Sequence, residues 1–315
     1  MDGLILSRKY YEECGRDVLY DRFGVLMDRV AVGLVGPGSE CLGFDDQFSR
    51  DHDWGPSFCL WLTDEDFALH GEALQAVYCQ LPQSFAGFSP RQVSQGEDGR
   101  VGAMSISSFY RRYTGLTAPP RTLGQWNIPS SHLSLCTNGE VFVDPLGTFT
   151  AWRDALLAYY PEDIRLKMVA DGCMRAGQAG QYNWQRGIMR SDPYVMAHAK
   201  VQFCTEAMQL IYLLNRAYAP YFKWLLRGLE RLPLLGVEVA PLLRDLLCSN
   251  AEMTGGEDTW VCQQNIIERI CQRLILEFYE QGLIREKTPF LLDQVPLILA
   301  GIEDAEFRAG FWGGR

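Results

Sequence analysis

Two acidic residues, Asp51 and Asp53, are separated by a single residue at the start of a stretch that predicts a β-strand from His52 to Thr63. Side chains two residues apart on a strand point to the same face of the sheet, so the two carboxylates can share one cation. Mg²⁺ is usually held by one or two carboxylates together with phosphate oxygens of a substrate. The pair therefore indicates a metal site that is completed by a phosphorylated molecule.

A second feature, Gly38-Ser39, follows a β-branched run from Arg29 to Gly36 that predicts a buried strand ending in a tight turn. Ser39 is suited to cap a short helix extending to Phe48. A helix N-terminus presents unpaired N–H groups and the positive end of the helix dipole, which together favour a phosphate. Two neighbouring predicted elements thus supply a phosphate cradle and a carboxylate pair, as two-metal phosphoryl chemistry requires.

Gly38-Ser39, eleven further residues and then Asp51-His52-Asp53 resemble the signature of the DNA polymerase beta-like nucleotidyltransferase superfamily. The wider stretch 33–56 is similar to a bacterial domain family of unknown function that is grouped with this superfamily. The segment Tyr218-Ala219-Pro220-Tyr221-Phe222-Lys223-Trp224 resembles a stretch in the helical domain of streptomycin-type aminoglycoside adenylyltransferases. The resemblance extends through about residue 235.

The resemblance implies an enzyme that uses ATP or another NTP together with two Mg²⁺ ions. Asp51 and Asp53 would be catalytic metal ligands, and Gly38 and Ser39 would contact the nucleotide phosphates. The expected reaction moves an NMP, with AMP from ATP as the first expectation, to a hydroxyl of a small acceptor and releases pyrophosphate. The alternatives are transfer to a protein or tRNA acceptor, or a nucleotide-sensing module without catalysis.

The superfamily has a third carboxylate on a later strand, and Asp144 is its best match here. Asp144 would bind metal or act as general base on the acceptor hydroxyl. Glu140, in the same predicted hairpin from His132 to Asp144, is the alternative.

Other residues have both a functional and a structural interpretation. Arg50 would contact a nucleotide phosphate or lie at the surface, and Lys223 would bind a phosphate or extend its stem along a helix. His52 is expected to be structural, and Asp45 and Asp46 to be surface charges or a cap. The candidate acceptor-pocket residues are polar or aromatic and come from the helical region: Tyr182, Asn183, Arg186, Asn215, Tyr218 and Tyr221.

The periodicity of apolar residues predicts an α+β protein whose character changes near residue 148. Residues 1–148 are expected to form a nucleotidyltransferase fold, a mixed β-sheet with flanking helices. Residues 149–315 are expected to form an all-α helical bundle that binds acceptor and nucleotide. Asn138-Gly139 between apolar alternations predicts a β-hairpin from His132 to Asp144.

The composition is that of an ordinary globular protein of 315 residues, with 47% apolar and 22% charged residues. A formal charge of −10 disfavours broad, sequence-independent binding to nucleic acid. The 10 cysteines have no zinc-finger spacing, so buried free thiols are expected. The sequence shows neither a signal peptide nor a membrane span, which predicts a cytoplasmic location.

Overall fold

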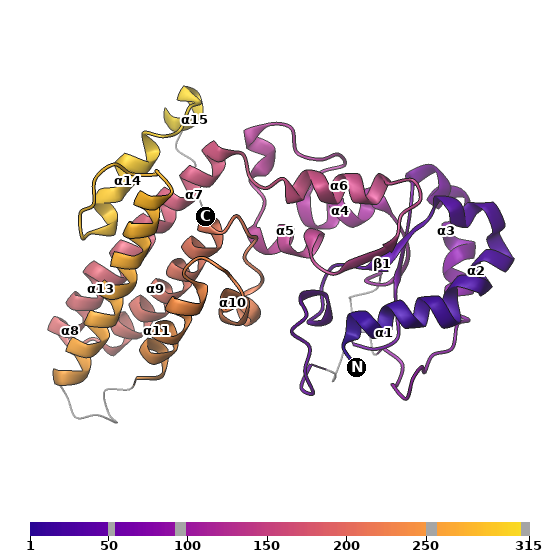
Figure 1. Cartoon of the computed structure of the whole chain (residues 1–315), viewed down its shortest axis with the longest axis horizontal. Helices are drawn as coiled ribbons and strands as arrows, with labels where there is room; N and C mark the ends of the chain where they lie inside the picture. The colour runs from indigo at the N-terminus through magenta and orange to yellow at the C-terminus, as the bar shows by residue number, and fades with distance from the viewer. Residues whose placement is uncertain (50–53, 92–98, 250–256, 310–315) are drawn as a thin grey trace. The chain divides into compact units, whose positions relative to one another are not determined.

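The computed structural model describes residues 1–49, 54–91, 99–249 and 257–309. The chain divides into two compact units, Met1–Tyr159 and Tyr160–Arg315, which run from indigo to pink and from pink to yellow in Figure 1. The first unit combines a small sheet with helices, and the described part of the second unit is helical. The α+β class expected from the sequence is confirmed at this level.

The first unit contains one four-stranded sheet. Its strands are β1 (Ala31–Leu34), β2 (Cys59–Leu62), β3 (Gly102–Ser105) and β4 (Glu140–Val143), in the order β3-β2-β1-β4. β1 is antiparallel to both β2 and β4, whereas β2 and β3 are parallel. The sheet is therefore mixed, as the sequence predicted.

The strand register brings several chain segments to one edge of this sheet. Gly33 near the end of β1 pairs with Cys59 at the start of β2 and with Val141 near the start of β4. β3 also begins here, since Gly102 pairs with Cys59. The turn Gly36–Ser39 leaves β1 at the same place, so we call this the turn edge of the sheet.

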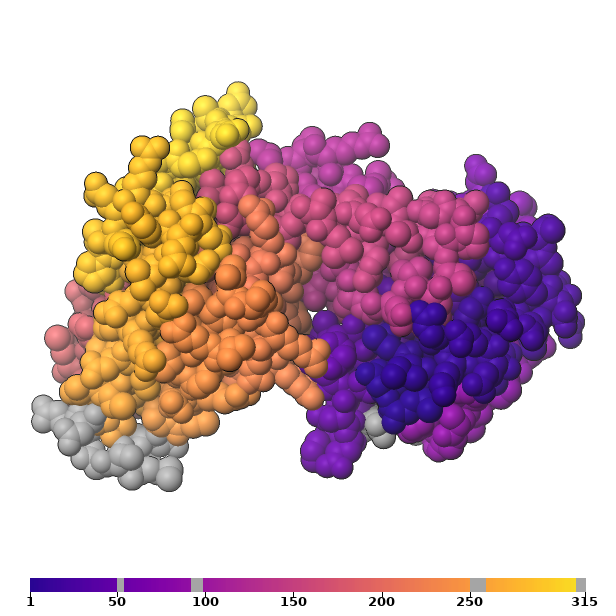
Figure 2. All heavy atoms as spheres, in the orientation of Figure 1, coloured from indigo at the N-terminus to yellow at the C-terminus, as the bar shows by residue number. Residues whose placement is uncertain are grey.

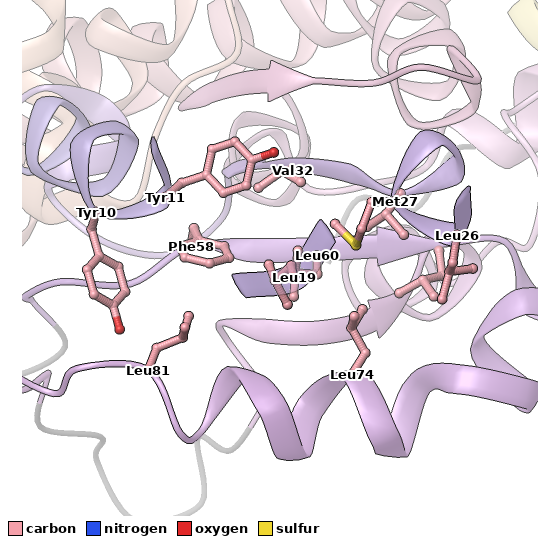
Figure 3. Close-up of a cluster of buried hydrophobic side chains, with 12 residues drawn as sticks. Tyr10, Tyr11, Leu19, Leu26, Met27, Val32, Phe58, Leu60, Leu74 and Leu81 are labelled. Carbon is pink, nitrogen blue, oxygen red and sulfur yellow. The ribbon is translucent and has the colours of Figure 1, made fainter. Parts of the chain in front are cut away.

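The core on one face of the sheet is closed by the N-terminal helices. α1 (Gly3–Tyr10) continues through a π-helical stretch, Tyr11–Gly15, into α2 (Arg16–Phe23), and apolar residues recur at helical spacing from Ser7 to Phe23. Apolar side chains of these helices, β1, β2 and α3 (Asp64–Tyr78) point toward one another in Figure 3. The buried members of this cluster are Tyr10, Tyr11, Leu19, Leu26, Met27, Val30, Val32, Phe58, Leu60, Leu62, Leu74 and Leu81.

α6 (Thr148–Leu157) belongs to the first unit because its aromatic side chains are part of that unit's core. The Phe149 ring stacks on Trp61 of β2, with centroids 3.9 Å apart, and Trp152 stacks on Tyr110 at 4.4 Å. The change in sequence character near residue 148 therefore marks the start of this helix, and the division between the units lies beyond it.

The hairpin predicted over His132–Asp144 is wrong. Residues Ser130–Thr137 form helix α5, and β4 pairs with β1 rather than with its neighbour in sequence. Leu133 and Cys136 are both fully buried at helical spacing. An apolar run of this length fits the periodicity of a helix as well as that of a strand. Pro129, just before α5, favours the start of a helix.

Among the remaining elements of the first unit, one differs from the sequence expectation in extent and two were not expected. β2 begins at Cys59, whereas a strand from His52 was expected, and residues 54–58 enter it as irregular chain. The sequence interpretation missed β3, since Gly-Ala-Met-Ser has little β propensity. It also missed α4 (Ile106–Thr114).

The second unit is a set of packed helices. α7 (Glu162–Ala176) packs against both α9 (Pro193–Leu214) and α14 (Leu291–Leu299), and the fully buried Ile267, Ile270 and Leu274 form the apolar stripe of α13 (Glu257–Glu280). Figure 2 shows one face of this unit with all heavy atoms drawn as spheres. Its elements are α7 (Glu162–Ala176), a π-helical stretch (Gly177–Asn183), α8 (Trp184–Arg190), α9 (Pro193–Leu214), α10 (Phe222–Leu229), α11 (Gly236–Cys248), α13 (Glu257–Glu280), α14 (Leu291–Leu299) and α15 (Ala305–Ala309). Within the described ranges, no helix has both the length and the apolar character needed to cross a bilayer.

Candidate active site

The turn that follows β1 depends on two glycines. Gly36 and Gly38 have φ values of 123° and 137°, in a region that other residues rarely adopt. Ser39 comes next and is largely buried. The expected tight turn after β1 is therefore present.

The short helix expected from Ser39 to Phe48 is reduced to one 3₁₀ turn, Glu40–Leu42. Gly43, with φ of 65°, ends it in the left-handed conformation, and the Ser39 side chain makes no capping bond. A three-residue turn has little of a helix dipole. The expected helix over Ser39–Phe48 is therefore wrong, and a phosphate cradle at this place would consist of the backbone of the turn itself.

Asn138 joins the turn to the start of β4. Its Oδ1 accepts a hydrogen bond from the Gly36 N–H at 2.9 Å, and its Nδ2 donates to the Gly36 carbonyl at 2.8 Å. The Gly139 N–H donates to the carbonyl of Cys41 at 2.7 Å, and Arg153 donates to the Asn138 carbonyl at 2.6 Å. Burial lowers the pKa of Arg153. The Asn-Gly pair thus fixes the turn after β1 instead of making a hairpin.

The two candidates for the third carboxylate lie at opposite ends of β4. Glu140 pairs with Leu34 at the turn edge, and its carboxylate accepts from Arg8 of α1. Asp144 follows Val143 at the far end of the strand, about 13 Å along at the usual rise per residue. There its Oδ2 accepts from the Thr150 N–H at 2.7 Å, in the first turn of α6. Asp144 is thus engaged as a helix cap away from the turn, and Glu140 is close to the turn.

Arg50, Asp51, His52 and Asp53 lie outside the residues that the structure describes. On either side of these residues, Ser49 and Trp54 donate hydrogen bonds to the carboxylates of Asp46 and Asp45. Asp46 Oδ1 accepts from the Phe48 and Ser49 N–H groups at 2.9 and 3.1 Å. Asp45 Oδ2 accepts from Trp54 Nε1 at 3.2 Å and from the Gly3 N–H at 3.0 Å. The structural interpretation of Asp45 and Asp46 is confirmed.

A buried ion pair lies beside the same turn. Arg91 Nη1 is 3.0 Å from Glu40 Oε1 and 3.1 Å from the hydroxyl of Ser57, just before β2. Burial raises the pKa of Glu40, while the charge of Arg91 opposes the shift. Sequence reasoning missed both partners. Arg91 lies in a Gly-, Ser- and Pro-rich loop, and nothing in that pattern connects it with a residue 51 positions earlier.

The candidate residues of the second unit form two local groups. Tyr182, Asn183 and Arg186 are exposed on the π-helical stretch and α8, with the Arg186 guanidinium 4.0 Å from the Tyr182 ring centroid. The other group lies where α9 ends and α10 begins. Lys223 is exposed there, in the first turn of α10.

Within the second group, Asn215 is a structural residue. Its Nδ2 donates to the carbonyls of Ile211 and Leu234, and its Oδ1 accepts from the Leu234 N–H at 2.9 Å. Tyr218 packs edge-on against Tyr160, with centroids 5.2 Å apart. Tyr221 is 55% exposed and precedes α10. Of these three residues, Tyr221 is the one whose side chain is most open to a ligand.

In the described ranges, no cluster of three or more His, Cys, Asp and Glu side chains is arranged to hold a metal ion. The expected ligands Asp51 and Asp53 are not in these ranges.

Residues 126–225 match a family described as a domain of unknown function, DUF4037. The matched stretch contains both Glu140 and Asp144 as well as the candidate residues of the second unit, but not Gly38 or Ser39. No curated protein and no solved structure matches the chain.

Proposed function

We propose that the chain is a metal-dependent nucleotidyltransferase that moves an NMP, in the first instance AMP from ATP, to a hydroxyl of a small acceptor. The observation that supports this most is the common position of the Gly36–Ser39 turn and the entry into β2. Gly33 of β1 pairs with Cys59 of β2, so the chain that follows Asp53 joins the sheet beside the turn. The Gly-Ser and Asp-x-Asp signature has the same order in sequence.

In the proposed reaction, the acceptor oxygen forms a bond to the α-phosphorus of the NTP. The bond between that phosphorus and the oxygen bridging to the β-phosphate breaks, and its electron pair leaves with pyrophosphate. The hydroxyl proton passes to a carboxylate. Glu140 is favoured for this role over Asp144, because it begins β4 at the turn edge while Asp144 caps α6.

The carboxylate oxygens of Asp51 and Asp53, with Glu140 as the third, are the donor type that Mg²⁺ prefers. Bound Mg²⁺ would supply electrostatic stabilisation of the charge that grows on pyrophosphate. The chain itself would contribute the backbone N–H groups of Gly38 and Ser39, in a turn whose first residue, Gly36, is held by Asn138.

Calorimetric titration with Mg–ATP and the other Mg–NTPs tests the proposed nucleotide and metal site. The wild-type protein is expected to bind one NTP only in the presence of Mg²⁺. Asp51→Asn/Asp53→Asn is expected to lower that affinity by at least about tenfold, because the ligands for the cation are lost. Equal affinity in the wild type and the double variant would remove the basis of the proposal.

The acceptor class is tested with labelled ATP and whole-cell lysate. A net charge of −10 favours a small cationic, hydroxylated acceptor, such as an aminoglycoside-like molecule, over tRNA. Label is therefore expected on small molecules. Label on protein or RNA bands alone would favour a macromolecular acceptor, and tight NTP binding without pyrophosphate release would favour a sensing module.

A further inference from the structure

The buried ion pair of Glu40 and Arg91 connects two segments at the turn edge. Nη1 of Arg91 lies 3.0 Å from Oε1 of Glu40, and the side chains of Arg91 and Glu40 are only 6% and 3% exposed. The same nitrogen donates to the Ser57 hydroxyl at 3.1 Å. One guanidinium therefore links the turn that follows β1 to the chain that enters β2.

The Glu40 carboxylate also determines the shape of the turn. A Cβ added to Gly38 would lie 2.6 Å from Oε2 and 2.7 Å from Cδ of Glu40. On the other side, a Cβ added to Gly3 of α1 would lie 2.5 Å from Cβ of Glu40. The side chain of Glu40 thus fills the space between α1 and the turn, and its carboxylate lies against the backbone at Gly38.

The position of this carboxylate creates an electrostatic problem for a phosphate on the turn. Oε2 of Glu40 and Nε of Arg91 are buried and have no hydrogen-bond partner within the described part of the chain. A buried charge is screened little by solvent and salt. An ionised Glu40 would therefore repel a phosphate at Gly38 and Ser39 unless a positive charge beside it cancels the field.

We infer that Glu40 and Arg91 are a positioning pair for nucleotide binding, in which Glu40 supports the turn backbone and Arg91 cancels the negative charge of Glu40. The turn can then present its N–H groups to a nucleotide phosphate without a repelling charge beneath them. The charge part of this inference rests on the proposed function, whereas the support of the turn does not. Neither side chain needs to touch the nucleotide.

Neutral amides at the two positions are expected to change nucleotide affinity unequally. Arg91→Gln removes the charge that favours ionised Glu40, so at alkaline pH, where the carboxylate is still ionised, it is expected to raise the Kd for Mg–ATP at least about tenfold. Glu40→Gln leaves a positive charge and is expected to raise that Kd less than about threefold. The double variant Glu40→Gln/Arg91→Gln is again neutral, so its Kd is expected to return close to the wild-type value. Equal losses in the single variants without recovery in the double variant would refute the charge compensation.

Hydrogen exchange in the protein without nucleotide tests the support of the turn separately. Backbone amides in residues 33–43 are expected to exchange about tenfold faster in both single variants, because the turn opens more often. Arg29→Gln is the matched control. It breaks the Arg29–Asp66 ion pair, 2.9 Å, elsewhere in the first unit, and is expected to leave this exchange unchanged. Unchanged exchange in Arg91→Gln and Glu40→Gln would overturn the positioning role whatever the nucleotide results.

Breaking a buried ion pair can unfold a domain, so the thermal unfolding of each variant is measured first. If Arg91→Gln does not fold, Arg91→Lys replaces it. Lysine keeps the charge but has a single nitrogen for Glu40 and Ser57. Exchange is then expected to rise while the Kd stays within about threefold of wild type. A tenfold loss of affinity in Arg91→Lys would refute the charge argument. Equal Mg–ATP affinity in the wild type and Asp51→Asn/Asp53→Asn would instead refute the proposed function, and the exchange experiment would still decide the positioning role.

Discussion

At the scale of single residues, the turn after β1 depends on one amide side chain. Asn138 satisfies both the N–H and the carbonyl of the buried Gly36. A buried polar group without a partner costs about 1–3 kcal/mol. One side chain from a distant part of the sequence therefore holds the backbone on which the proposed phosphate site is built.

Asn138→Ala is expected to lower the free energy of unfolding of the first unit by about 2 kcal/mol, because two backbone groups of Gly36 lose their partners. Urea unfolding followed by circular dichroism measures this change. Asn127→Ala, at an exposed position, is the control and is expected to have little effect. A loss in Asn138→Ala no larger than in the control would contradict the role assigned to this side chain.

Glu140 and Asp144 are expected to respond differently to substitution. Glu140→Gln should slow pyrophosphate release about 10²-fold or more, since it removes the proposed base. Asp144→Ala should leave that rate nearly unchanged but lower the stability of the first unit by about 1 kcal/mol, because the cap at the Thr150 N–H is lost. Pyrophosphate assays and urea unfolding of both variants check this. The reverse pattern would identify Asp144 rather than Glu140 as the third carboxylate.

At the scale of elements, local sequence patterns predicted the strand β1, because its β-branched run ends in clear turn signals. They could not predict which strand β4 pairs with. Its partner, β1, lies about a hundred positions earlier, and the Asn-Gly signal favoured a local hairpin. In the candidate site, too, local features could be predicted from the sequence, whereas contacts between distant segments could not. Gly38 and Ser39 were recognisable from their spacing, but Arg91 and Asn138 act through contacts between distant segments.

The pairing of β1 with β4 depends on the absence of a side chain at Gly33. A Cβ there would lie 2.3 Å from the carbonyl oxygen of Glu140 and 2.9 Å from Cα of Val141. Because both atoms belong to the backbone, neither can rotate away. Gly33→Ala is expected to destabilise the first unit by about 3 kcal/mol. Gly124→Ala, with open space around it, is the matched control, and thermal unfolding measures both. Equal melting temperatures would mean that the two strands are less closely packed.

At the scale of the whole molecule, the ten cysteines divide according to burial. Three are exposed, Cys14 is half-buried and six are buried. Burial raises the pKa of Cys59 and Cys136 from 9.0 to about 12. Each of these thiols therefore stays protonated in the folded chain at pH values at which the same thiol in the unfolded chain, with its lower pKa, loses its proton. The two thiols contribute to the free energy of unfolding below pH 9, and this contribution is lost as the pH rises.

A thiol reagent at pH 8 is expected to label three cysteines of the folded protein rapidly and Cys14 more slowly. Six cysteines are expected to react only after denaturation, because they are buried and protonated. Mass spectrometry of labelled peptides identifies the positions. Rapid labelling of a buried cysteine would contradict the packing of its unit. The expected fast group is Cys79, Cys248 and Cys262.

The division into units after Tyr159 rather than near residue 148 has a direct consequence for the fragments 1–148 and 1–159. The shorter fragment lacks Phe149 and Trp152, which stack on Trp61 and Tyr110. Losing buried aromatic side chains of this size costs about 3–5 kcal/mol each, comparable to the whole stability of a domain.

The fragment 1–159 is therefore expected to show a near-ultraviolet circular dichroism signal from packed aromatic rings and a cooperative urea transition, because it contains the complete first core. The fragment 1–148 should lose both. Phe149→Ala/Trp152→Ala in the longer fragment is the control that separates the loss of packing from the loss of chain length, and it should reproduce the behaviour of the short fragment. A cooperative transition of 1–148 at the same urea concentration as 1–159 would mean that α6 adds nothing to the first core.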